Sequence, residues 1–141
     1  MSENLDKLKS ALAQEGLRFT QQREAVWNEI LSNDDHRDAE DIYIALRKNG
    51  LSVSRATVYR TIDVLVKNNM VRKLDVGFGS SKFEHKMDPV HHDHIICVQC
   101  GKIEEFVDDE IEMIQDKIAA AHGFELVKHT HQLFGKCRDC Q

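Results

Sequence analysis

The sequence predicts an α+β protein that is helical in its first half and mixes strands with one helix in its second half. Three observations lead to this fold class. Apolar residues recur at helical spacing as far as Val66. Two short strand-like runs then flank a glycine-rich segment, as in a β-hairpin. Beyond them, four cysteines in two Cys-x-x-Cys pairs indicate a small unit stapled by a metal ion.

Four helices are predicted in the first half. Most of them begin after a side chain that can cap a helix or end at a glycine, and each carries an apolar stripe that can face a common core. The starts and stops are Gly16 after the first helix, Thr20 before the second, Asp38 and Gly50 around the third, and Ser54 before the fourth. The stripes are Leu5, Leu8 and Leu12; Val26, Trp27, Ile30 and Leu31; Ala39, Ile42, Tyr43 and Leu46; and Val58, Ile62, Leu65 and Val66.

Two short strands are predicted after these helices, at residues 71–74 and 82–84, around a turn at 77–81 that is rich in glycine and serine. Helices followed by a two-stranded hairpin have the layout of a winged helix-turn-helix, whose second helix lies in the major groove of DNA. We therefore expect a DNA-binding domain at residues 1–84, a hinge at 85–90 and a second domain at 91–141.

The first turns of the fourth helix carry the side chains expected to read DNA. Arginine can bind guanine through two hydrogen bonds, and alanine, threonine and aromatic side chains can contact thymine methyl groups. Other basic residues can hold phosphates or enter the minor groove. The alternative is a helical protein-interaction module with ordinary surface arginines. The candidates for base contacts are Arg55, Ala56, Thr57, Tyr59 and Arg60, and those for the backbone or minor groove are Arg18, Arg23, Arg72 and Lys73.

The second half is predicted to hold paired strands at 94–97 and 103–106, joined by the first Cys-x-x-Cys turn. Acidic residues at 108–110 suit the start of a helix that runs to His122. A last strand is expected at 124–134, before the second cysteine pair. The apolar residues of the helix that we expect to face inward are Ile111, Ile114 and Ile118.

Composition limits the classes of protein to consider. We expect a cytoplasmic protein without membrane contact, because no apolar run is long enough to cross a bilayer and no signal-peptide pattern opens the chain. Residues 1–86 hold 14 Lys and Arg against 13 Asp and Glu, whereas residues 87–141 hold 5 against 11 and most of the histidines. An acidic, histidine-rich half attracts cations, and the overall acidity argues against strong nonspecific DNA binding.

The cysteine spacing predicts a structural zinc site made of Cys97, Cys100, Cys137 and Cys140. Two thiolates separated by two residues can bind one ion, and two such pairs complete a tetrahedral shell. In a cytosolic chain, this pattern favours metal over disulfides. The alternative, a pair of redox-active dithiols, normally occurs at a helix start in a thioredoxin-like unit, and the sequence contains no such pattern.

The run His91-His92-Asp93-His94 offers harder ligands, which suit an exchangeable ion such as iron, manganese or zinc. If the run is extended, His92 and His94 face one way, and His91 and Asp93 face the other, so that one segment can serve two sites. The alternative is a group of solvated surface histidines. Candidates for the further ligands are His36, Glu84, Glu105, Glu112 and His129.

Taken together, these motifs resemble those of the ferric uptake regulator (Fur) family over nearly the whole chain. The resemblance is carried by residues 16–20 with Arg23, by 56–60, by Phe83-Glu84, by 91–94 and by both cysteine pairs. It implies a homodimer or tetramer that regulates transcription by binding palindromic double-stranded operator DNA. It also implies an N-terminal winged helix and a C-terminal α/β dimerisation domain.

The resemblance assigns roles to individual residues. Arg18 resembles the basic residue that enters the minor groove, and Tyr59 resembles the tyrosine that touches thymine. Glu104 stays an alternative to Glu105, because an apolar residue usually stands at its position. The residues that match the sensory metal site joining the domains are His36, Glu84, His92, His94 and Glu105, and those that match an additional site are His91, Asp93, Glu112 and His129.

The same resemblance favours iron as the sensed metal. A cysteine usually replaces Glu84 in the zinc-sensing branch, and in the peroxide-sensing branch aspartates replace Glu84 and Glu105 while asparagine replaces Arg60. We therefore expect a repressor of iron-uptake genes with structural Zn(II) and regulatory Fe(II). The alternatives are a peroxide-, manganese- or zinc-responsive relative, a metal-storage protein and a metallohydrolase. A metallohydrolase normally needs a larger scaffold and would leave the first half without a role.

Overall fold

A computed structural model describes residues 2–33, 35–77, 79–86 and 93–141 of the 141-residue chain. The chain divides into two compact units, Met1–Pro89 and Val90–Gln141, which are considered one at a time. The expected domain boundaries at 84 and 91 remain a prediction. Residues 87–90 of the expected hinge lie outside the described residues. Among the residues that are described, no helix has the length and apolar character needed to cross a bilayer.

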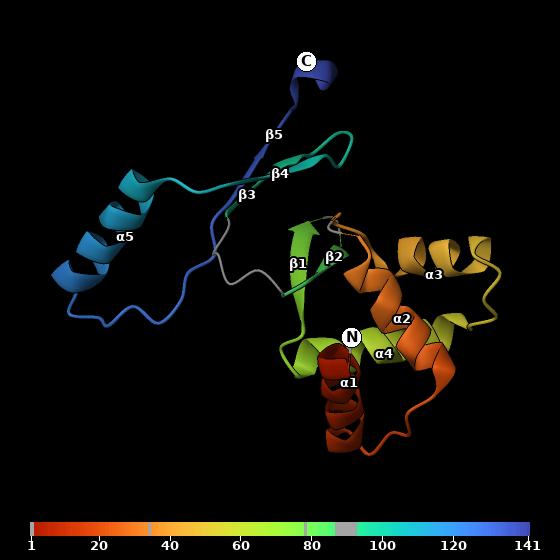
Figure 1. The fold of residues 1–141 in the computed structure, drawn as a ribbon. Coiled ribbons are helices and arrows are strands. Elements are labelled where there is room, and N and C mark those ends of the chain that lie inside the picture. Colours follow the sequence, from red (N-terminus) through yellow and green to blue (C-terminus); the bar gives the residue numbers. More distant parts are fainter. Residues whose placement is uncertain (1, 34, 78, 87–92) are drawn as a thin grey trace. The chain divides into compact units, whose positions relative to one another are not determined.

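Helices and then a β-hairpin make up the described part of the first unit (Figure 1). The side chains of Thr20 and Ser54 each accept a hydrogen bond from a backbone N–H three residues later, and Asp38 forms a reciprocal capping box with Asp41. These contacts fix the predicted helix starts. The elements are α1 (Ser2–Gln14), α2 (Gln21–Leu31), α3 (Ala39–Lys48), α4 (Arg55–Lys67), β1 (Val71–Gly77) and β2 (Ser80–His85).

The predicted apolar stripes meet in one core between these helices. Leu8 and Leu12 of α1, Trp27 of α2 and Leu65 of α4 are each at most 2% exposed. Full burial of a side chain of this size contributes about 1.5–3 kcal/mol. The indole N–H of Trp27 also donates to the backbone carbonyl of Asn4 at 3.2 Å, which attaches α1 to α2. The helices of the first unit therefore provide a stable base for the hairpin.

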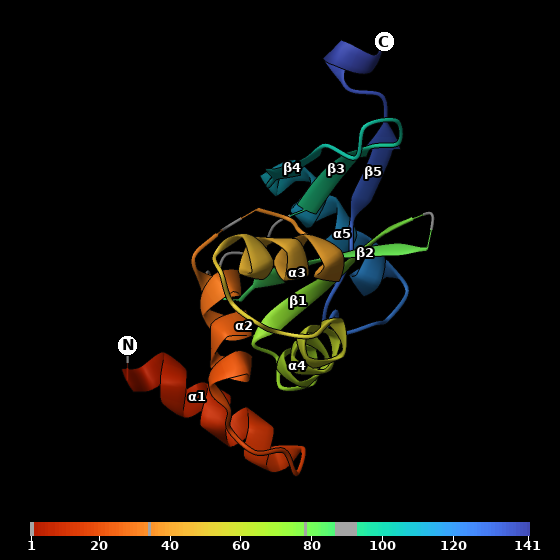
Figure 2. The same ribbon diagram turned by 90° about the vertical axis from the view of Figure 1, so that its right-hand side faces the viewer.

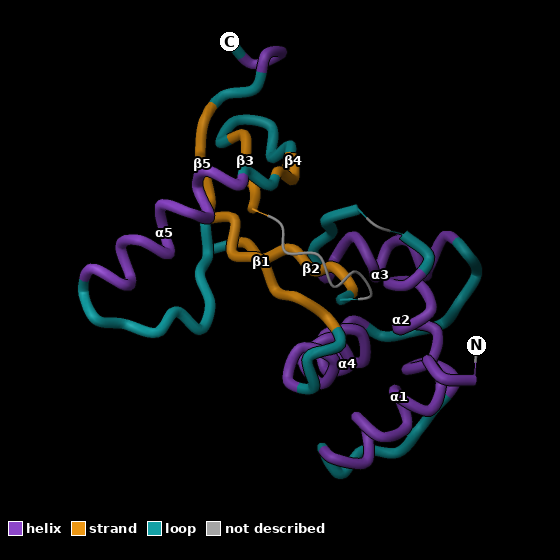
Figure 3. The backbone as a smooth tube through the Cα atoms, turned by 60° about the vertical axis from the view of Figure 1, so that its left-hand side comes forward, coloured by secondary structure: helices purple, strands orange, loops and turns teal. Residues whose placement is uncertain are grey.

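The hairpin is antiparallel, with Arg72 opposite Glu84, and a bulge interrupts the register between Asp75 and Gly77. Figure 3 shows β1 and β2 as adjacent strands after α4. On the other side of β2, Phe83 donates its backbone N–H to the carbonyl of Arg37 at 2.7 Å. The loop before α3 is therefore attached directly to the hairpin.

A three-stranded sheet with the order β4-β3-β5 organises the described part of the second unit (Figure 2). The central strand is antiparallel to β4 and parallel to β5. A parallel neighbour requires a crossover connection, and α5 lies within it. The elements are β3 (Asp93–Cys97), β4 (Ile103–Phe106), α5 (Asp109–Ala121), β5 (Gln132–Gly135) and a short 3-10 helix, η1 (Arg138–Cys140).

Two expectations for the second unit are wrong in the single chain. The last strand covers only Gln132–Gly135, not 124–134, because its hydrogen-bonded pairing with β3 begins at Gln132. Residues 124–131 instead return the chain from α5 to the start of that strand. The isoleucines of α5 do not face a core: Ile114 is 54% exposed and Ile118 is 55% exposed, and none of the thirteen described residues of α5 is buried. The amphipathic pattern marks a surface that this chain alone leaves uncovered.

Candidate metal centres and nucleic-acid interface

The four cysteines lie together at one end of the sheet in the second unit. One sulfur from each of Cys97, Cys100, Cys137 and Cys140 lies within 4.8 Å of the others. The Cys100 and Cys137 sulfurs are 3.7 Å apart. The parallel pairing of β5 with β3 brings the second pair beside the first. Four thiols at this spacing fit the tetrahedral all-sulfur shell of a zinc ion.

The electrostatics of the cysteine cluster also suit a cation. Backbone N–H groups of Cys100 and Cys137 donate to the Cys97 sulfur at 3.4 Å, and they lower the pKa of this thiol to about 5. A hydrogen bond with Cys137, and then burial, raises the pKa of Cys140 to about 12. One thiolate therefore forms readily, whereas another keeps its proton until a positive charge compensates the crowded sulfurs.

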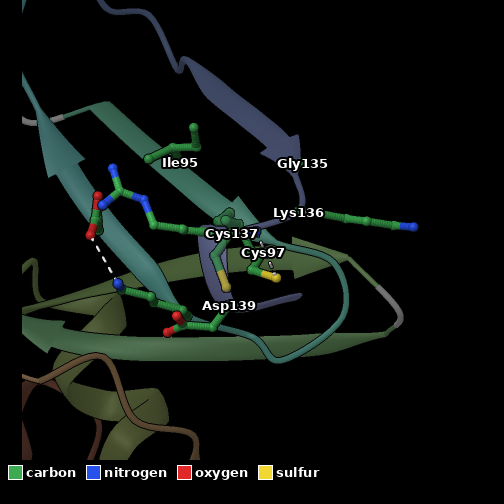
Figure 4. A pocket seen from close by; sticks show the side chains of 10 residues that line it. Ile95, Cys97, Gly135, Lys136, Cys137 and Asp139 are labelled. Atoms are coloured by element: carbon green, nitrogen blue, oxygen red, sulfur yellow. Dashed lines mark hydrogen bonds and ion pairs between the residues drawn. The ribbon is translucent and has the colours of Figure 1, made fainter. Parts of the chain in front are cut away.

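A cavity of about 550 Å³ borders this cluster (Figure 4). Cys97 and Cys137 line it, whereas the long side chain of Lys136 extends away from the sulfurs. The side of the cavity towards β4 carries Glu104, which pairs with Lys102 at 3.2 Å. Two of the four cysteines therefore border an open space beside the cluster.

A second cluster in the same unit joins Asp93 of β3, Glu112 of α5 and His129 before β5. The Nε2 atom of His129 lies 3.6 Å from Asp93 Oδ1 and 3.3 Å from Glu112 Oε1. Asp93 is only 1% exposed. The three residues offer ligand atoms within 4.8 Å of one another. His91, the remaining residue predicted for this site, lies outside the described residues.

The next residue on β3, His94, belongs to a different group of ligands. Its Nε2 lies 3.9 Å from Glu105 Oε1, and the register pairs His94 with Glu105 and Ile95 with Glu104. Because Glu104 is directed to Lys102, the geometry favours Glu105 as the ligand. Asp93 and His94 serve separate clusters, as alternation along a strand predicts. His92 lies outside the described residues.

In the first unit, His36 and Glu84 form the third group. His36 Nε2 lies 2.9 Å from Glu84 Oε2, and both side chains are largely buried. The other oxygen of Glu84 accepts a hydrogen bond from Arg72 at 3.1 Å. The sequence had suggested Arg72 for phosphate contact and gave no sign of this pair. Only the register of the hairpin, which places Arg72 opposite Glu84, could have indicated it.

A partly buried ion pair positions the loop that carries His36. Arg37 donates to the Glu29 carboxylate at 2.9 Å and to the Glu29 carbonyl at 2.8 Å. The carbonyl of Arg37 accepts from Phe83, the residue before Glu84. This backbone hydrogen bond between Phe83 and Arg37 therefore helps to position both Glu84 and His36, their neighbours in the chain. Imidazole and carboxylate donors brought together in this way suit iron, manganese or zinc.

The candidate DNA-reading residues lie at the start of α4. Arg55, Ala56, Tyr59 and Arg60 are exposed, and Thr57 is half-buried next to the cap residue Ser54. Among the basic residues predicted for the DNA backbone or minor groove, Arg18 and Lys73 are exposed. Arg23 instead donates its guanidinium to the carbonyl of Arg18 and so shapes the loop before α2.

Within this surface, Glu40 of α3 engages two of the α4 side chains. Arg55 binds the Glu40 carboxylate through two nitrogens at 2.9–3.2 Å and stacks over the Tyr43 ring at 4.4 Å. The Tyr59 hydroxyl lies 3.5 Å from the same carboxylate. The hydrogen bond with Arg55 lowers the pKa of Glu40. The sequence did not point to Glu40, because it lies on a different helix.

Comparisons with known proteins agree with this arrangement. The family model described as "Ferric uptake regulator family" matches residues 14–134. The ferric uptake regulation protein of Campylobacter jejuni is 41% identical over 138 residues, covering 96% of this chain and 87% of the relative. The structure of the Helicobacter pylori ferric uptake regulator, described as having three functional metal-binding sites, matches at a TM-score of 0.90 and 32% identity, covering 99% and 93%. The structure of the Francisella tularensis ferric uptake regulator with iron matches at a TM-score of 0.83 and 29% identity, covering 89% of this chain and 95% of that chain.

The helical unit with its hairpin, the clustered metal ligands and these similarities define a metal-responsive transcription regulator. The chain belongs to the ferric uptake regulator family, because both the family model and relatives above 30% identity cover most of its length.

Proposed function

We propose that the chain is an iron-responsive repressor of iron-uptake genes. In this proposal, zinc held by Cys97, Cys100, Cys137 and Cys140 staples the second unit. One observation carries the choice of iron. All four cysteines gather in one cluster, so the remaining ligand groups offer only imidazole and carboxylate donors. Such donors suit Fe(II) and Mn(II), whereas a thiolate would favour zinc.

The proposed regulatory site draws its ligands from both units. The first unit contributes His36 and Glu84, and the second contributes Glu105 with His94 and the predicted His92. A bound divalent ion supplies a positive charge that these ligands share. Because each unit holds only part of the ligand set, complete coordination requires a defined arrangement of the units. Metal affinity and DNA affinity are then linked, and each must change the other by the same factor.

The proposed DNA contacts lie on the first unit. Arg55, Ala56, Thr57, Tyr59 and Arg60 of α4 read base edges in the major groove, while Arg18 enters the minor groove. The exposure of Arg18, Arg55, Ala56, Tyr59 and Arg60 supports this role, and Thr57 is half-buried. Arg23 acts indirectly, because its guanidinium holds the carbonyl of Arg18.

A homodimer that binds a palindromic operator completes the proposal. The uncovered face of α5 supports it, because Met113, Ile114 and Ile118 are each more than half exposed. A second copy of the same surface would bury them, and its two-fold symmetry matches a palindrome. Asp93, Glu112, His129 and the predicted His91 form an additional metal site within the second unit. We place the protein in the cytoplasm, where its DNA target lies.

The test is anaerobic binding to a fragment of the gene's own promoter, with Fe(II), Mn(II) and Zn(II) titrated separately. The proposal expects tight binding with Fe(II) or Mn(II) that survives brief exposure to peroxide. Loss of binding after peroxide with Fe(II), but not with Mn(II), would identify a peroxide sensor. A response to zinc alone, at much lower free concentration, would identify a zinc sensor.

A further inference from the structure

The Glu84 carboxylate is shared between a candidate metal ligand and a fixed cation. On one side, Oε2 lies 2.9 Å from His36 Nε2, and on the other side Oε1 accepts from Arg72 Nη1 at 3.1 Å. The glutamate side chain is 9% exposed, and that of Arg72 is 29% exposed. The pair is partly shielded from water, where a charge acts more strongly than on an open surface.

We propose that Arg72 sets the metal affinity of the regulatory site by competing with the metal ion for Glu84. This inference rests on the proposed function, in which Glu84 is a ligand. The guanidinium occupies one carboxylate oxygen, so that binding of an ion through both oxygens requires Arg72 to withdraw. Its positive charge also disfavours a divalent cation at the neighbouring oxygen.

The same contact stabilises the metal-free state. A buried carboxylate without a compensating cation is costly, and Arg72 supplies this compensation when no metal is bound. Arg72 and the metal ion therefore perform the same electrostatic task in turn. With Arg72 present, a higher free metal concentration is needed to fill the site than would be needed without it. Arg72 thus acts through Glu84 and sets the metal concentration at which the regulator responds.

The adjacent residue provides a matched control. Lys73 lies opposite Phe83 in the register and is exposed, whereas Arg72 lies opposite Glu84. Successive side chains of a strand point to opposite faces. Lys73→Gln thus removes a positive charge from the same strand without touching the Glu84 carboxylate.

The experiment measures Mn(II) binding to the full-length, zinc-loaded chain by competition with a fluorescent chelator. Glu84→Gln identifies the binding phase that belongs to this site. We expect Arg72→Gln to tighten that phase by about tenfold, which corresponds to about 1.4 kcal/mol. Arg72→Lys, which keeps the charge, and Lys73→Gln should leave the dissociation constant of that Mn(II) phase, measured without DNA, within about threefold of the parent value. The Mn(II) concentration for half-maximal DNA binding should fall with Arg72→Gln by the same factor as the dissociation constant.

Unchanged or weaker Mn(II) binding by Arg72→Gln, with the phase still lost in Glu84→Gln, would overturn the inference and leave the proposed function standing. Arg72→Thr provides a second neutral variant with a side chain suited to a strand, and it should show the same tightening. If Glu84→Gln changes no Mn(II) phase, the proposed site is wrong and the inference fails with it.

Discussion

The cysteine cluster and the histidine–glutamate pairs differ in how many ligands one unit supplies. Four sulfurs of the second unit lie within 4.8 Å of one another, enough for a complete tetrahedral shell. Among the described residues, His36 with Glu84 and His94 with Glu105 each offer two candidate ligands in their own unit, and the predicted His92 would add a third in the second unit. A complete set inside one unit stabilises that unit permanently. In the proposed function, an incomplete set is completed by ligands from the other unit, so its occupancy reports on the state of the whole chain.

Loss of one thiolate should produce the largest effect. Structural zinc contributes apparent binding free energies of about 10–16 kcal/mol in small zinc-finger peptides, and few of the side chains that the structure describes in the second unit are buried. We expect Cys97→Ser to lose its zinc and its dimer content together. Zinc per chain after denaturation and mass by light scattering provide the measurements.

His122→Ala, an exposed position at the end of α5, is the matched control and should keep both zinc and dimer. Full retention of zinc by Cys97→Ser would show that three thiolates suffice.

Removing the Glu84 charge should have the next largest effect. It affects a histidine–glutamate pair and not the cysteine cluster. We expect Glu84→Gln to weaken Fe(II)- or Mn(II)-dependent promoter binding by about 100-fold, at the upper end of a typical coupling free energy, while zinc content stays unchanged. Fluorescence anisotropy with labelled promoter DNA measures this change.

Glu104→Gln makes the same chemical change at an exposed glutamate that pairs with Lys102, and it should bind DNA like the parent chain. Equal losses in both variants would remove the distinction between Glu84 and a surface carboxylate.

Proton release on zinc binding sharpens the comparison further. The backbone donors that lower the pKa of Cys97 to about 5 keep this thiol ionised at pH 7. Their stabilisation of the metal-free second unit is present above the ordinary thiol pKa of about 8.5 and is lost as pH falls through about 5. Zinc binding to the reduced, metal-free chain at pH 7 should therefore release fewer than four protons. Calorimetry in buffers of different ionisation enthalpy counts these protons, and release of all four would contradict the effect of the backbone donors.

The smallest predicted effect concerns the DNA-reading surface. Glu40→Gln should release Arg55 and remove a negative charge next to α4, and so increase DNA affinity by about two- to fivefold in low salt. Glu3→Gln, at an exposed pair on α1, is the control. A loss of affinity in Glu40→Gln would instead mean that Glu40 holds Arg55 in its reading position.

Local sequence patterns predicted the elements, and their outcomes show where local patterns fail. Capping residues such as Asp38 fixed the helix starts, because the capping interaction lies within four residues of sequence. The cysteine spacing led directly to the thiolate cluster, which the strand pairing then assembles. The α5 isoleucines were placed inward because periodicity identifies an apolar face but not what covers it.

Side-chain partners across strands required the structure. The preference for Glu105 over Glu104 follows from the β3–β4 register, which two adjacent glutamates in a sequence cannot show. The Arg72–Glu84 and Arg55–Glu40 pairs join residues 12 and 15 positions apart. Such pairs depend on hairpin register and helix packing, whereas the sequence had suggested Arg55 and Arg72 for DNA contacts and Glu84 for a metal ion.

Stepwise metal removal tests the division of labour between the two kinds of site most directly. The fully metal-loaded chain would be treated anaerobically with a chelator of increasing strength, while iron release, zinc release and promoter binding are followed in the same sample. We predict that promoter binding is lost together with iron, while about one zinc per chain remains, as expected for a site with four thiolate ligands. Promoter binding that persists until zinc leaves would contradict the assignment of the regulatory role to the histidine–glutamate pairs.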